Sequence, residues 1–175
     1  MHRTHLLALC ATVVLTLFIA DALRADDDTH AKKGPPSKAQ PALDKLKTLK
    51  GEWVYAGGEN KGQLAVRYEV SGGGSAVIER LFPGTDHEMI TVYHLDGDRL
   101  MMTHYCAAGN QPRMHAEPAT DRLVFTCTGG SNMTESDGHM HAMTLTFVDD
   151  DHVKAEWTWK GAETQTKPFE FERKR

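Results

Sequence analysis

The residues best suited to chemistry gather in one short stretch of the chain. Imidazole, phenol and thiol groups stand together at His104, Tyr105 and Cys106, and an amide-rich turn then leads to Arg113 and His115. Guanidinium groups bind carboxylates and phosphates through paired hydrogen bonds, so Arg113 can hold one end of a small ligand while His104 or Tyr105 orients the other. A plain turn followed by a solvated strand is the alternative interpretation.

A second group of candidate ligands is the pair His139 and His141. Alternate residues of a strand share a face, so both imidazoles can bind one metal ion if His104 or His115 supplies a third ligand. Paired histidines near a loop are more often solvated, and haem ligation is a further alternative because a ten-stranded barrel can be wide. We expect no metal and no cofactor, and keep both as alternatives.

Covalent catalysis has little support in the sequence. Cys106 is two residues from His104, but nothing indicates an oxyanion hole. We therefore expect no catalytic residues. The alternative is a small enzyme that performs acid–base chemistry with His104, Tyr105 and either Glu79 or Glu88.

The elements that position these groups are predicted to be antiparallel strands. Apolar and polar residues alternate in about ten successive segments, and short turns rich in glycine or aspartate separate most of them. No connection has room for the crossover that a parallel pair needs. The predicted fold is an all-β, antiparallel up-and-down β-barrel of about ten strands with a short N-terminal helix. The predicted strands are residues 52–57, 63–71, 75–82, 87–95, 98–106, 112–118, 121–128, 139–149, 152–160 and 165–173.

Three middle strands predict a cavity. Residues 75–82, 87–95 and 98–106 carry apolar side chains on both faces, mixed with polar ones. Ligand pockets are mainly apolar with a few placed polar groups, so we interpret this mixture as cavity lining; an outer face covered by the N-terminal segment or a partner is the alternative. The expected ligand-binding residues are Tyr68, Glu79, Met89, His104, Tyr105, Arg113, His139 and His141.

The N-terminus has the order of an export signal, which we assign to residues 1–25. A short basic start precedes the apolar run Leu6 to Ala20, and small residues allow cleavage after Ala22 or Ala25. The run is too short to span a bilayer comfortably, although an uncleaved anchor is the alternative. We expect an exported protein, periplasmic or secreted, with no stable membrane insertion after cleavage.

The rest of the chain divides into a linker and one domain. Residues 26–41 are polar and rich in Lys, Pro and Ala, which predicts a disordered linker. Residues 42–175 suit one domain with one core. Leucines at helical spacing within residues 41–50 predict a helix that Gly51 ends.

The net charge of the chain narrows the classes of molecule that it can bind. The formal net charge is −4 and no basic stripe is present, so nucleic acid is not expected. The expected partner is a small hydrophobic or amphipathic molecule.

A disulfide bridge between Cys106 and Cys127 needs Cα atoms within about 7 Å, whereas an intervening strand would separate their backbones by about 10 Å. Free thiols are favoured, and the bridge is the alternative.

The start of the predicted barrel carries a resemblance. A short helix followed by Gly51-Glu52-Trp53 resembles the Gly-x-Trp opening of the calycins, which include lipocalins, fatty-acid-binding proteins and nitrobindins. Residues 81–84, 87–89 and 103–114 are similar to exported bacterial proteins of unknown function with lipocalin-like domains. The resemblance implies a barrel that Trp53 closes at one end, and export, but no activity. A nitrobindin-like haem ligand near the C-terminus would have to be His152, in a predicted turn.

Overall fold

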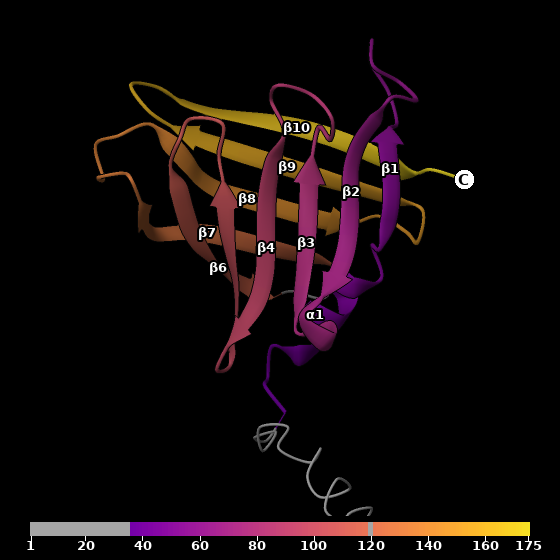
Figure 1. The fold of residues 1–175 in the computed structure, drawn as a ribbon, viewed down its shortest axis with the longest axis horizontal. Helices are drawn as coiled ribbons and strands as arrows, with labels where there is room; N and C mark the ends of the chain where they lie inside the picture. Colours follow the sequence, from indigo (N-terminus) through magenta and orange to yellow (C-terminus); the bar gives the residue numbers. More distant parts are fainter. Residues whose placement is uncertain (1–35, 119–120) are drawn as a thin grey trace, which may run out of the picture. The chain divides into compact units, whose positions relative to one another are not determined.

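Ten antiparallel strands close into a single β-barrel in the computed structural model, which describes residues 36–118 and 121–175 (Figure 1). Strands that are neighbours in the sequence are neighbours in the barrel, and the last strand pairs with the first to close it. The predicted fold class is therefore confirmed. The strands are β1 (Gly51–Tyr55), β2 (Leu64–Ser71), β3 (Ala76–Leu81), β4 (Met89–Asp96), β5 (Arg99–Tyr105), β6 (Gln111–Pro118), β7 (Arg122–Ser131), β8 (His139–Phe147), β9 (His152–Lys160) and β10 (Thr164–Arg173).

The predicted export signal, residues 1–25, lies outside the described residues, as does most of the predicted linker, residues 26–41. Ser37–Arg175 form one compact unit. Within the described ranges, no helix combines the length and apolar character needed to cross a lipid bilayer.

Side-chain alternation along each strand builds the core. In β9, for example, Val153, Ala155 and Trp157 are buried, whereas Lys154 and Glu156 between them are partly exposed. The same period of two places apolar side chains of the other strands inside the barrel. The interior is therefore packed largely with apolar side chains, and polar groups inside it stand out.

Helix α1 (Gln40–Lys47) covers one end of the barrel. Leu43 and Leu46, together with Leu49 just after the helix, are buried, and the helix contacts β2, β3, β4 and β5. Figure 1 shows α1 at the end where β2 finishes and β3 begins. We call this the helix end, and the opposite end, where β3, β5, β7 and β9 finish, the open end.

Trp53 of β1 lies buried at the helix end. Its indole Nε1 donates a hydrogen bond to the Leu49 carbonyl at 2.7 Å, and its ring packs edge-on against Tyr68, with 6.4 Å between centroids. On another side the Arg173 guanidinium lies 4.4 Å from the ring centroid. Gly51 has φ +132°, a conformation that a side chain would strain, so glycine is needed where the chain enters β1.

Candidate functional site

A buried carboxyl group is the centre of a polar network inside the barrel. Glu79 is only 1% exposed, and its two oxygens accept hydrogen bonds from the hydroxyls of Tyr68 at 2.8 Å and Tyr93 at 2.7 Å. Burial raises the pKa of Glu79 above its ordinary value of 4.5, while hydrogen bonds from Tyr93, Tyr68 and Thr91 oppose the rise. The carboxyl group is thus fully partnered by protein hydroxyls.

Thr91 links this network to His104. Its Oγ1 lies 2.9 Å from the Nδ1 atom of His104. Thr91 also acts on the Glu79 carboxyl group as a hydrogen-bonding side chain. In the arrangement in which Thr91 donates its single hydroxyl proton to Glu79, Thr91 accepts from His104, and Nδ1 of His104 carries the ring proton. The other ring nitrogen, Nε2, then has a free lone pair, and no described residue pairs with it.

Burial also fixes the charge of His104. It lowers the pKa of the imidazole from 6.5 to about 4, because a charged ring is poorly solvated inside the barrel. At neutral pH His104 is therefore an uncharged hydrogen-bond acceptor.

A cavity of about 270 Å³ lies at the open end and includes His104 in its wall. Its apolar lining comes from inward-facing side chains of β3, β4 and β8 to β10, namely Leu81, Met89, Met140, Trp157, Trp159 and Phe169. The polar side chains His87, Gln165 and Lys167 complete the lining. The ring of His104 lies 4.7 Å from that of Trp157, whose Nε1 is also buried without a partner among the described residues.

Phe82 lies in the wall of this cavity in an uncommon backbone conformation. Its φ is +53°, a region that bulky residues rarely adopt. The ring stacks on Tyr55, with 6.5 Å between centroids, and packs on Phe169 at 5.9 Å. Such strain persists only where surrounding contacts hold it.

Four of the sequence-predicted site residues share the barrel interior. Tyr68, Glu79, Met89 and His104 are all buried. Tyr105, by contrast, is 51% exposed, because neighbouring residues of a strand point to opposite faces. The structure therefore separates the His104 and Tyr105 pair that an acid–base site would need.

Other site residues are displaced or were missed. Arg113 is exposed on β6 and does not join His104. Three further interior residues were not predicted as site residues from the sequence, namely Thr91, Tyr93 and Trp157. Thr91 and Tyr93 stand in phase with Met89 along β4, so this alternation was the signal that could have identified them.

His139 and His141 lie together at the start of β8, also toward the open end. Nε2 of His139 is 3.3 Å from Nδ1 of His141. The third ligand-type side chain beside them is Cys127, not His104 or His115. Cys127 and Cys106 are both free thiols. Burial, with smaller effects from Lys160 and His139, lowers the pKa of His141.

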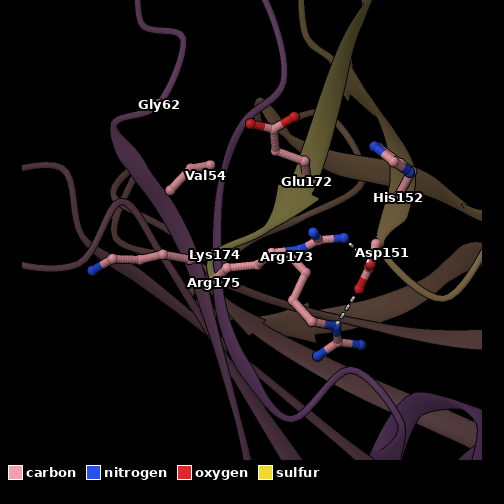
Figure 2. Close-up of a pocket in the computed structure, with 8 residues that line it drawn as sticks. All are labelled: Val54, Gly62, Asp151, His152, Glu172, Arg173, Lys174 and Arg175. Carbon is pink, nitrogen blue, oxygen red and sulfur yellow. Dashed lines mark hydrogen bonds and ion pairs between the residues drawn. The ribbon is translucent and has the colours of Figure 1, made fainter.

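A larger hollow of about 360 Å³ lies elsewhere, beside the C-terminal residues (Figure 2). Its basic side chains are already engaged: Arg173 and Arg175 pair with Asp151 at 3.3 and 3.1 Å, and Lys174 pairs with Glu52 at 2.8 Å. We interpret this hollow as part of the closure of the barrel. His152 also lines it and lies 2.8 Å from Asp149, outside the barrel cavity, so it does not provide an interior haem ligand.

Comparisons with known proteins do not assign the chain to a family. No family model matches the chain, and no curated protein matches its sequence significantly. The closed ten-stranded antiparallel barrel is consistent with a calycin-like fold.

Proposed function

We propose that this protein binds a small, partly apolar molecule at the open end of its barrel and does not catalyse a reaction on it. The observation that carries this proposal is the pair of unpartnered buried atoms, His104 Nε2 and Trp157 Nε1, in the wall of an apolar cavity. A buried polar group without a partner costs about 1–3 kcal/mol. A ligand that offers a donor to His104 and an acceptor to Trp157 recovers this free energy.

Cavity size and lining narrow the ligand class. The volume of about 270 Å³ is near the lower end of the usual range of about 300–1,000 Å³, which favours a compact molecule. Met89 and Phe169 offer an apolar surface, while the exposed Lys167 can meet a polar or anionic end that remains in water. The expected ligand is therefore amphipathic.

The position of Phe82 is a further support for the proposal. A residue in a sparsely populated backbone region costs about 1–3 kcal/mol, and such residues cluster at ligand sites. Here the strained residue belongs to the cavity wall. This links the backbone strain to the same site as the unpartnered atoms.

The test uses tryptophan fluorescence, since Trp157 and Trp159 both line the cavity. Titration with anilinonaphthalene sulfonate should quench the wild-type emission saturably at one site. His104→Phe, which removes the acceptor nitrogen but keeps a ring, should weaken binding at least about fivefold, the loss of one net hydrogen bond. Tyr105→Phe is the matched control, because Tyr105 is exposed on the same strand.

Unchanged near-ultraviolet circular dichroism must accompany these titrations, because the probe also binds loosened proteins. Absence of saturable quenching, or equal affinities for wild-type and His104→Phe proteins, would refute the proposal.

We also propose that the protein is exported to the periplasm or the medium, with a domain at residues 42–175 that resembles those of exported bacterial lipocalin-like proteins. The supporting features are the basic start, apolar run and small residues of positions 1–25. N-terminal sequencing of protein recovered outside the cytoplasm should begin at Leu23 or Asp26. A chain that still begins at Met1 would contradict cleavage.

A further inference from the structure

Three metal-ligating side chains meet where two strands of the barrel wall separate. The β7–β8 ladder ends at the pair Thr126 and Ala142. The next residues beyond it are Cys127 on β7 and His141 on β8, and His139 follows on β8. The Sγ atom of Cys127 and one ring nitrogen from each histidine all lie within 4.8 Å of one another.

Bulges in both strands shape this cluster. In the β6–β7 ladder the register shift leaves Thr128 of β7 without a paired residue on β6. In the β8–β9 ladder a similar shift leaves His141 of β8 without a paired residue on β9. Bulges redirect side chains and are common beside functional sites. The backbones of β7 and β8 are therefore both distorted at the point where they carry these three side chains.

His139 is oriented as a metal ligand would be. It is 3% exposed, and its Nδ1 lies 2.7 Å from the Asp137 carbonyl oxygen. A carbonyl only accepts, so Nδ1 holds the proton and Nε2 of the neutral ring presents its lone pair toward His141. Metal-binding histidines commonly donate their other ring N–H to a backbone carbonyl in this way.

The loop that carries this carbonyl is itself held in place. The Asp137 carboxylate accepts hydrogen bonds from the Thr134 backbone at 2.7 Å and hydroxyl at 2.9 Å. Asn110, from the β5–β6 turn, donates to the Gly138 carbonyl at 2.8 Å. Contacts on both sides of Asp137 thus fix the orientation of His139 before any ion binds.

We propose that Cys127, His139 and His141 bind one late first-row transition-metal ion, such as Zn²⁺, through Sγ, Nε2 and Nδ1. Thiolate and imidazole are the ligands that such ions prefer, and three protein ligands leave a fourth position open to water or another ligand. None of these three residues lines the cavity beside His104, so either proposal can fail without the other.

Binding requires a small contraction and one proton release. Tetrahedral bonds of about 2.0–2.3 Å place ligand atoms roughly 3.5 Å apart. Because the three ligand atoms lie within 4.8 Å of one another, no separation has to shrink by more than about 1.3 Å. Cys127 loses its thiol proton to solvent, and the proton of His141 moves from Nδ1 to Nε2. Cys127 and His141 are partly exposed, which gives the ion a path from solvent.

Titration of the reduced, metal-free protein with Co²⁺ tests this site. Wild-type protein should bind one equivalent, with thiolate-to-cobalt charge-transfer absorption and the visible bands of tetrahedral cobalt, and one equivalent of Zn²⁺ should remove both signals. Cys127→Ser should lose the charge-transfer absorption, and His141→Ala should bind Co²⁺ at least about tenfold more weakly.

The matched controls are Cys106→Ser, which removes the other free thiol, and His152→Ala, which removes a histidine distant from the cluster. Both should bind Co²⁺ as the wild type does. Because Cys127 and His141 are partly exposed, their variants should remain folded, and far-ultraviolet circular dichroism checks this. A wild-type protein without charge-transfer absorption, or folded Cys127→Ser and His141→Ala proteins with wild-type affinity, would overturn the proposal.

Discussion

The buried carboxyl group of Glu79 makes the stability of the folded protein depend on pH. Burial holds the pKa of its carboxyl group above the ordinary value of 4.5. Above pH 4.5 the unfolded chain has released this proton while the folded protein still holds it, so folded-state stability falls as pH rises toward the folded pKa. The hydroxyls of Tyr68 and Tyr93 limit this loss because they donate to both carboxyl oxygens.

Glu79→Gln removes the titrating proton and keeps the shape of the side chain. We expect the stability of this variant, relative to wild type, to improve as pH rises above 4.5. Urea unfolding at a series of pH values measures the difference. Glu69→Gln, on the exposed face of β2, reports the effect of removing a surface carboxylate. A Glu79→Gln difference that is constant across the series would show that burial does not raise the pKa.

At the scale of elements, α1 stabilises the barrel by covering its helix end with leucines. Leu46 is completely buried, and truncation of such a side chain leaves a cavity that the surroundings fill only in part. We expect Leu46→Ala to lower the free energy of unfolding by about 2–5 kcal/mol, measured by urea denaturation. Lys50→Ala, at an exposed position just after the helix, should change it by no more than about 0.5 kcal/mol. Equal effects would show that α1 is not part of the cooperative unit.

The strands were predictable from sequence because alternation and turn residues are local signals. The faces were harder to assign: in β3 the buried Val77 and Glu79 alternate with Ile78, which is partly exposed, so both phases carry apolar residues. Two of the residues named from the sequence, Glu79 and His104, lie inside the barrel, whereas Tyr105, which was grouped with His104, lies outside it. The Cys127 cluster depends on the bulges and on where the β7–β8 ladder ends, which are properties of strand pairing.

At the scale of the whole molecule, the barrel closes where its last strand, β10, pairs with its first strand, β1. The ladder between β1 and β10 spans only Trp53 to Tyr55 on β1. Arg173 reinforces it: Nη2 donates to the Thr48 carbonyl at 3.0 Å and Nη1 to the Lys50 carbonyl at 3.2 Å, while the guanidinium packs on Trp53. A side chain from the last strand thus holds the segment that enters the first.

Arg173→Lys tests whether this closure depends on the shape of the guanidinium. Lysine keeps the charge but cannot reach separate carbonyls on Thr48, Lys50 and Asp150 in the same planar arrangement. We expect the free energy of unfolding to fall by about 2–3 kcal/mol, measured by urea denaturation. Arg175→Lys is the matched control, because Arg175 has one exposed ion pair and should change stability by no more than about 0.5 kcal/mol. If both variants unfold alike, the β1–β10 ladder and the buried core close the barrel without help from Arg173.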